Sequence, residues 1–219
     1  MIMTVLLSDP RIAAITARET GEPLVDAAEV PELRADADPP GSLVRQGVLE
    51  RLLVAQAALP AGLRLLIHEG YRSPGVQHRY FSDYREQLRA RYPGWTGERL
   101  HTEASKFVSP PDVAPHCTGG AVDLTLATAT GARLDMGTAI NASPEASANA
   151  CYTAATSISP EARSNRDMLA AALAGAGLIN YPTEWWHWSY GERYWAYTTG
   201  RPATVYAAVS PREHEERPL

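Results

Sequence analysis

Two short segments of this chain carry side chains suited to one chemical task, and the fold must bring them together for that task. His116 and Asp123 lie seven positions apart, and a Glu184-Trp-Trp-His187 segment follows much later. Two imidazoles and a carboxylate form the kind of three-ligand set that holds catalytic zinc, with a fourth position left for water. Glu184 stands three residues before a ligand and can accept that water's proton. We therefore predict one zinc site built from both segments.

The composition is that of an ordinary globular protein. The chain has 219 residues, 45% hydrophobic and 21% charged, and a formal net charge of −5. We expect one domain over 1–219 with a substantial core, and no basic surface for nucleic acid or a membrane. No apolar run approaches the roughly 20 residues of a spanning helix. Two cysteines are too few for a secreted disulfide framework, so we expect a cytoplasmic protein, with its oligomeric state open.

Local signals divide the chain into helices and strands. Ser73-Pro74 and Ser159-Pro160 each combine an N-cap with a proline in the first turn. Apolar spacing and alternation indicate the other elements. We predict helices over 42–59, 73–91, 96–107 and 159–175, and strands over 63–67, 120–126 and 184–191. This order predicts an α+β fold with a small sheet and separate helices.

The remaining segments are predicted from their polar or irregular composition. The opening apolar residues of the chain indicate a strand or a packed arm, and the acidic, proline-rich residues that follow complete an irregular N-terminal arm over 1–41. Residues 200–219 are expected to be a solvated polar tail. Residues 137–157 are small and polar and suit a substrate loop. Alternation along 120–126 places Asp123 on the face that lines a site, and Trp185 and His187 are expected to share a face of their strand.

Several segments resemble the D-alanyl-D-alanine dipeptidases of the VanX type. Pro115-His-Cys-Thr-Gly-Gly-Ala-Val-Asp-Leu-Thr-Leu126 is similar to their SxHxxGxAxDLTL segment, Glu184–Trp188 to their EWWH segment, and Glu69–Arg72 to their DGYR segment. Weaker similarities to two further family segments lie at 135–138 and 159–166, and all five segments occur in the order found in the family. The resemblance implies the α+β zinc fold shared with hedgehog-like proteins, in which helices flank a small, central, mostly antiparallel sheet.

The resemblance also implies roles for individual residues. His116, Asp123 and His187 would be the zinc ligands and Glu184 the catalytic base. Arg72 would stabilise the transition state, a role suited to a guanidinium because it stays charged and its donors are fixed in geometry. Tyr71 and Trp185 are expected to bind substrate, which would be a small peptide.

One position departs from the family pattern. The dipeptidases carry an acid after their MGT-like element that is thought to hold the free ammonium of the dipeptide, whereas Asn141 stands at or near that place. An amide accepts a hydrogen bond but neutralises no charge. Glu145 in the same loop is an alternative source of charge. The leading hypothesis is a zinc peptidase for D-Ala-D-Ala or a closely related peptide. The alternatives are a carboxypeptidase for a longer or N-blocked peptide and a non-catalytic zinc peptide-binding module.

The cysteines and the other histidines carry weaker expectations. Cys117 follows the first ligand and either pairs with Cys151 or remains a packed thiol, which a reducing cytosol favours. His68, His78 and His101 have no motif around them and are expected to be structural or exposed.

Overall fold

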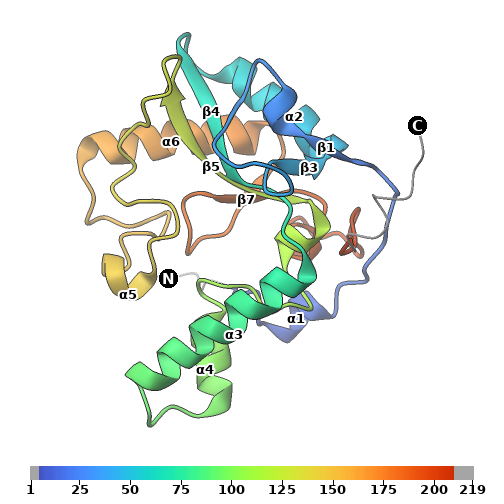
Figure 1. Ribbon diagram of the computed structural model, residues 1–219, viewed down its shortest axis with the longest axis vertical. Coiled ribbons are helices and arrows are strands. Elements are labelled where there is room, and N and C mark those ends of the chain that lie inside the picture. The colour runs from blue at the N-terminus through green and yellow to red at the C-terminus, as the bar shows by residue number, and fades with distance from the viewer. Residues whose placement is uncertain (1–4, 210–219) are drawn as a thin grey trace.

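The computed structural model describes residues 5–209, and a mixed sheet lies at its centre (Figure 1). Its five strands run in the order β2-β4-β5-β7-β6 among the described residues. They are β2 (Arg34–Ala35), β4 (Leu63–Glu69), β5 (Ala121–Thr128), β7 (His187–Ser189) and β6 (Ile179–Asn180). All neighbouring pairs are antiparallel except β2 with β4. A separate antiparallel pair joins β1 (Leu24–Asp26) and β3 (Leu43–Arg45).

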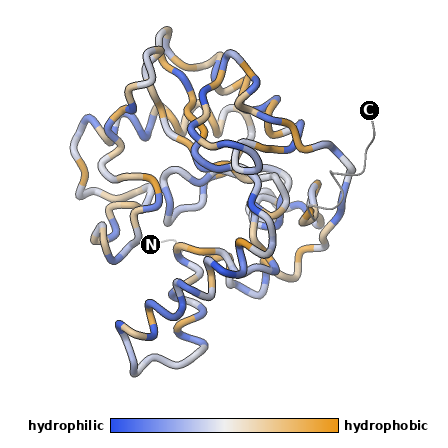
Figure 2. Tube along the Cα trace, viewed as in Figure 1, coloured by the Kyte–Doolittle hydropathy of each residue, from blue (hydrophilic) through white to orange (hydrophobic). Residues whose placement is uncertain are grey.

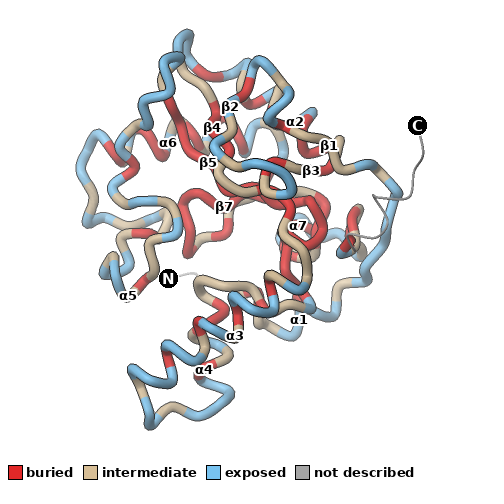
Figure 3. Tube along the Cα trace, viewed as in Figure 1, coloured by how far each residue is buried: buried red, intermediate tan, exposed pale blue. Residues whose placement is uncertain are grey.

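Two helices pack with this sheet to form the main core. α2 (Gln46–Ala58) and α6 (Pro160–Gly175) contribute their apolar sides to one cluster with β4 and β5. Its fully buried members include Val48, Leu52, Leu65, Ile67, Leu124, Leu126, Leu169 and Leu173. Each such side chain contributes about 1.5–3 kcal/mol when it leaves water. In Figure 3 the central strands are buried along most of their length, so they form a firm support for any side chain they carry.

A helical hairpin projects from this body. α3 (Pro74–Arg91) and α4 (Gly97–Ala104) pack on each other through a small cluster of their own, built on Phe81, Tyr84, Leu88, Leu100 and Ala104. Ser73 caps α3 by accepting a hydrogen bond from the Val76 amide at 3.4 Å. Hydrophilic and hydrophobic residues alternate along α3, whose outer side faces solvent (Figures 2 and 3). The hairpin therefore has less apolar support than the sheet.

The predicted helices and strands are largely confirmed, with differences at several ends. The helix from 73 to 91 and the one from 159 to 175 begin and end as predicted. Residues 43–45 form β3 instead of the first turn of α2. Only His187–Ser189 of the predicted strand over 184–191 is a strand. Two successive turns precede it, closed by the Glu184 amide on the Tyr181 carbonyl and the His187 amide on the Glu184 carbonyl.

The start of the chain is a packed arm, one of the two predicted alternatives, whereas the described part of the C-terminal segment packs more closely than predicted. In the N-terminal arm Leu7 and Ile12 are buried, with α1 (Pro10–Ala13) at its start. The arm also forms β1, the short helix Ala27–Glu29 and β2, so it is less irregular than expected. The prediction of a solvated tail from residue 200 is wrong for its described part, since Tyr206 is 1% exposed and its hydroxyl donates to Glu22. Residues 1–4 and 210–219 lie outside the described residues.

The remaining helices are α5 (Pro144–Ser147), the short helix Pro115–Thr118 and α7 (Arg193–Thr198). None of the helices in the described part of the chain combines the length and apolar character needed to cross a membrane.

Candidate metal centre

The three predicted ligands meet in space. Asp123 on β5 lies opposite His187 on β7 in the strand register, and the short helix Pro115–Thr118 places His116 beside them. His116 Nε2 lies 3.1 Å from His187 Nδ1 and 3.3 Å from Asp123 Oδ1, and His187 Nδ1 lies 3.0 Å from Asp123 Oδ1. Tetrahedral zinc with bonds of about 2.0–2.1 Å separates its ligand atoms by about 3.3 Å. The donor set therefore fits zinc in both chemistry and spacing.

The surroundings of these residues orient them for ligation. His116 Nδ1 is 2.6 Å from the Gly70 carbonyl oxygen, so it donates there and leaves Nε2 for an ion. All three side chains are buried. Burial lowers the pKa of His187, which favours the neutral imidazole that ligation requires. Burial alone would raise the pKa of Asp123, but the charges and hydrogen bonds of His116 and His187 hold this pKa below its ordinary value. Asp123 is therefore a carboxylate in this setting.

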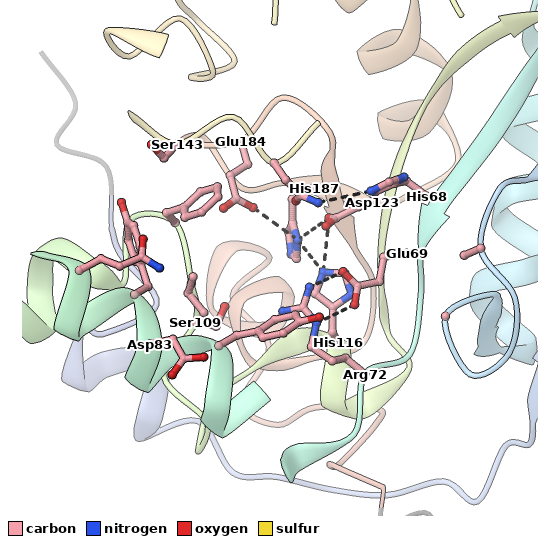
Figure 4. Close-up of a pocket in the computed structure, with 18 residues that line it drawn as sticks. His68, Glu69, Arg72, Asp83, Ser109, His116, Asp123, Ser143, Glu184 and His187 are labelled. Atoms are coloured by element: carbon pink, nitrogen blue, oxygen red, sulfur yellow. Dashed lines mark hydrogen bonds and ion pairs between the residues drawn. The ribbon is translucent and has the colours of Figure 1, made fainter. Parts of the chain in front are cut away.

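Glu184 faces the same point from the turn that precedes β7 (Figure 4). Its Oε2 lies 3.8 Å from His187 Nδ1, and the residue is only 6% exposed. Burial, and then the nearby charge of Asp123, raises the pKa of Glu184 well above its ordinary value. A carboxylate with a raised pKa is a better match for accepting and returning a proton near neutral pH.

Arg72 lies at the start of the hairpin and is held on several sides. Its Nε donates to Glu69 Oε1 at 2.7 Å, Nη2 donates to Glu69 Oε2, and Nη1 donates to Gln77 Oε1 at 2.9 Å. Its backbone amide donates to the His116 carbonyl at 3.2 Å, which ties the arginine to a predicted ligand. The guanidinium is thus fixed beside the ligand set and needs little reorganisation to meet a developing negative charge.

A cleft of about 700 Å³ opens over these residues and lies between the sheet and the hairpin. His116, Asp123, Glu184 and His187 line it together with Arg72. From the hairpin, Tyr80, Asp83, Tyr84 and Gln87 form the opposite wall. These four share one side of α3 by their helical spacing. Such a volume lies in the range of sites that hold ligands of drug size.

The predicted substrate-binding residues divide into two groups. Asn141 lines the cleft. Tyr71 and Trp185 are absent from the described lining, because both are buried and their polar atoms point elsewhere. The Tyr71 hydroxyl donates to the Val209 carbonyl at 2.9 Å, and the Trp185 indole donates to Thr138 Oγ1 at 2.8 Å. In this structure these two residues support neighbouring segments and do not face the cleft.

Glu145, the alternative source of charge, lies outside the described lining of the cleft, and the two cysteines are buried. Glu145 accepts a hydrogen bond from the Tyr84 hydroxyl at 2.7 Å and is absent from the described lining of the cleft. It therefore does not supply the charge that Asn141 lacks. Cys117 and Cys151 are buried and unpaired, which agrees with packed thiols and not with a disulfide.

Some residues of the cleft were not predicted from the sequence. His68, expected to be structural or exposed, lines the cleft next to Asn141. Asp83, Ser109 and Ser143 line it as well. The helical spacing of Tyr80, Asp83, Tyr84 and Gln87 on α3 was the one available signal, because it marks a shared face on a helix that follows Arg72 directly.

Comparison with known proteins shows the class to which the chain belongs. The model of the D-ala-D-ala dipeptidase family Peptidase_M15 matches residues 39–203, so the chain belongs to this family of metallopeptidases. The D-alanyl-D-alanine dipeptidase of Synechocystis sp. is 28% identical over 221 aligned positions, which cover 84% of this chain and 88% of that protein. The D-alanyl-D-alanine dipeptidase of Escherichia coli is 38% identical over 72 positions, 33% of this chain and 35% of that protein.

Two solved structures are also similar. The LD-carboxypeptidase LdcB is 19% identical with a TM-score of 0.44, over 82% of this chain and 73% of that one. A VanB-type D,D-pentapeptidase VanY in complex with Zn(II) is 16% identical with a TM-score of 0.45, over 86% of this chain and 96% of that one. The predicted family is therefore confirmed by the family match, and the predicted α+β sheet architecture by the strands themselves.

Proposed function

We propose that this metallopeptidase hydrolyses D-alanyl-D-alanine or a closely related small peptide of D-amino acids, with zinc held by His116, Asp123 and His187. The observation that carries this proposal is the spacing of the three ligand atoms, 3.0–3.3 Å, with the buried Glu184 carboxylate 3.8 Å from one of them. The D-alanyl-D-alanine dipeptidase of Synechocystis sp., which this chain resembles over most of its length, supports the choice of substrate.

The side chains of this site divide the reaction between them. Bound zinc supplies Lewis acidity, which acidifies water and polarises a carbonyl oxygen. Glu184 takes the proton of the attacking water and delivers it to the leaving amine, as its raised pKa allows. Arg72, fixed by Glu69 and Gln77, donates to the oxygen on which negative charge develops. The buried position of the ligands keeps bulk water from competing with these interactions.

A second substrate class is favoured by two features of the cleft. Its volume of about 700 Å³ exceeds what two alanines fill, and Asn141 presents an amide where an ammonium would need a charge. Both features suit a D,D-carboxypeptidase that acts on a longer or N-blocked peptide. A peptide-binding module without turnover is disfavoured, because Glu184 and Arg72 would have no purpose there.

Release of D-alanine by the purified, zinc-loaded protein tests the function directly. We expect D-Ala-D-Ala or its N-acetylated form to be cleaved, activity to disappear on chelation, and zinc to restore it. A fully zinc-loaded protein that cleaves neither compound would contradict the proposal. We further propose a cytoplasmic location, for which the two unpaired thiols are the support.

A further inference from the structure

His68 occupies a special position in the sheet. The pairing of β4 with β5 shifts between Ile67 and Glu69, so His68 is the extra residue of a β-bulge. A bulge changes the direction of a side chain relative to regular strand alternation and is common next to active sites. In Figure 4 His68 lies at the edge of the cleft on the side away from Asp83. His68 has no role in the proposed hydrolysis.

The ring of His68 is held in one orientation by a charged neighbour. β2 runs beside β4, and the Asp36 amide that follows β2 donates to the Ile67 carbonyl at 3.0 Å. This places Asp36 Oδ1 3.2 Å from His68 Nδ1, while Arg133 pairs with the other oxygen of the same carboxylate. A carboxylate can only accept a hydrogen bond, so in the neutral imidazole of His68 the proton resides on Nδ1 and is donated to Asp36. Nε2 is left as an acceptor.

That acceptor orients Asn141. The Asn141 side-chain nitrogen Nδ2 lies 3.3 Å from His68 Nε2 and donates to it. Asn141 has a φ of 63°, a left-handed conformation that asparagine tolerates better than most residues. With Nδ2 directed at the histidine, the amide oxygen of Asn141 is available to accept from a ligand.

Among the described residues, the edge formed by His68 and Asn141 has no carboxylate with spare charge, because Asp36 beside His68 is paired with Arg133. Four carboxylates line the cleft: Glu69, Asp83, Asp123 and Glu184. Arg72 neutralises Glu69, Asp123 belongs to the candidate ligand set, and Glu184 lies beside that set. Asp83 lies across the cleft on α3 (Figure 4). An ammonium at this edge would give up hydration without a charged partner, whereas a backbone N–H needs only one acceptor.

We propose that His68 and Asn141 form a neutral subsite for a backbone amide of the substrate. The subsite would favour peptides in which the α-nitrogen of the residue before the cleaved bond is acylated, by a longer chain or by a blocking group. It would disfavour dipeptides in which this nitrogen is a free ammonium. His68 is then a specificity-determining residue that acts by holding the Asn141 amide with its oxygen toward the substrate. This inference rests on the proposed zinc peptidase function, and within it favours the longer or N-blocked peptides over free D-Ala-D-Ala.

Binding measurements test the subsite without requiring turnover. D-Ala-D-Ala and N-acetyl-D-Ala-D-Ala are titrated by calorimetry into the zinc-loaded Glu184→Gln protein. We expect the acetylated compound to bind at least about tenfold more tightly. Adding Asn141→Asp should reverse this preference, since a carboxylate there pairs with an ammonium. Adding His68→Ala should weaken binding of the acetylated compound about tenfold and that of the free dipeptide much less.

Matched controls separate the subsite from general effects. Asn149 is also exposed and left-handed, with a φ of 64°, but lines a different cavity, so Asn149→Asp should leave the preference unchanged. The exposed His78 on α3 provides the control for His68, and His78→Ala should leave the binding of both compounds unchanged.

The outcomes distinguish this inference from the proposed function. Equal or tighter binding of the free dipeptide overturns the subsite, as does an equal loss for both compounds in the His68→Ala protein. Hydrolysis by the protein with Glu184 intact is scored separately. Selective binding of the acetylated compound without hydrolysis by that protein would contradict the proposed function while supporting the subsite.

Discussion

The two walls of the cleft are built differently. The sheet wall carries Asp123 and His187 on paired, buried strands that rest on the large apolar cluster shared with α2 and α6. The hairpin wall rests on a separate small cluster and projects from the body (Figures 1 and 3). Groups that hold an ion need positions accurate to a fraction of an ångström, which a packed sheet provides. The hairpin contributes other lining residues across the cleft, among them Tyr80 and Asp83, which hold no ion and tolerate more movement.

This comparison predicts that changes on the sheet side abolish chemistry, and the largest expected effect is at Glu184. Glu184→Ala should lower kcat by about 10³–10⁴-fold, because the proton acceptor is lost. Zinc should stay near one per chain, because the three ligands are untouched. Hydrolysis assays with metal analysis on the same sample measure both quantities.

The control is Glu86→Ala, which removes an exposed carboxylate from the hairpin and should leave both quantities unchanged. His187→Ala should by contrast lose the zinc itself. Retained turnover in the Glu184→Ala protein would remove Glu184 from the role of base.

Arg72 joins the two walls, and its replacement should have the next largest effect. Arg72→Lys keeps a positive charge but loses the fixed fork that Glu69 and Gln77 hold. We expect kcat to fall about 10²–10³-fold with a smaller change in KM, because the interaction is made mainly in the transition state. Arg79→Lys, at an exposed position on α3, is the matched control. A rise in KM alone would show that Arg72 binds substrate and does not stabilise the transition state.

A pair of core substitutions compares the walls directly. Leu124 and Leu88 are 0% and 2% exposed, in the sheet and hairpin clusters respectively. Each change to alanine should cost about 3 kcal/mol. For Leu124→Ala we expect this cost to appear as a lower free energy of global unfolding, together with weaker zinc binding. For Leu88→Ala we expect faster amide hydrogen exchange confined to α3 and α4, a raised KM and unchanged zinc affinity.

If Leu88→Ala instead lowered protection evenly through the sheet, the hairpin would be an integral part of the core. The comparison on which these predictions rest would then be wrong.

The smallest effect concerns the two thiols, which pack on the body of the protein. Burial raises the pKa of Cys117 to about 12, and burial also raises the pKa of Cys151. The reactive thiolate is therefore scarce at pH 8 and increases about tenfold for each further pH unit. We expect an aromatic disulfide reagent to label neither thiol of the native protein within minutes at pH 8, and both after unfolding. Rapid labelling of one thiol in the native protein would contradict this packing.

Features specified by neighbouring residues were the most predictable from the sequence. Ser73-Pro74 and Ser159-Pro160 determine where two helices begin, since an N-cap and a first-turn proline act within one turn. The three candidate ligands were predicted from residue type and spacing together with the family resemblance, and the structure brings them together as a cross-strand pair with an added histidine.

Features that depend on distant contacts were missed. Tyr206 lies in a short, mostly small and apolar segment without a regular pattern, and the segment packs through contacts with residues far away in the chain, including Glu22 and Gly191. Tyr71 and Trp185 have residue types suited to a pocket, but strand and turn geometry direct their polar atoms to Val209 and Thr138. His68 faces the cleft because of a bulge, which no local pattern in the sequence announces.

The central claim is that His116, Asp123 and His187 hold one zinc ion. X-ray absorption at the zinc edge, on protein loaded with one equivalent of zinc, tests this most directly. We predict only nitrogen and oxygen neighbours at about 2.0–2.1 Å, with the outer-shell pattern of two imidazoles, and loss of the bound zinc in the His116→Ala protein, as in the His187→Ala protein. A sulfur neighbour at about 2.3 Å, as Cys117 would supply, would contradict the account.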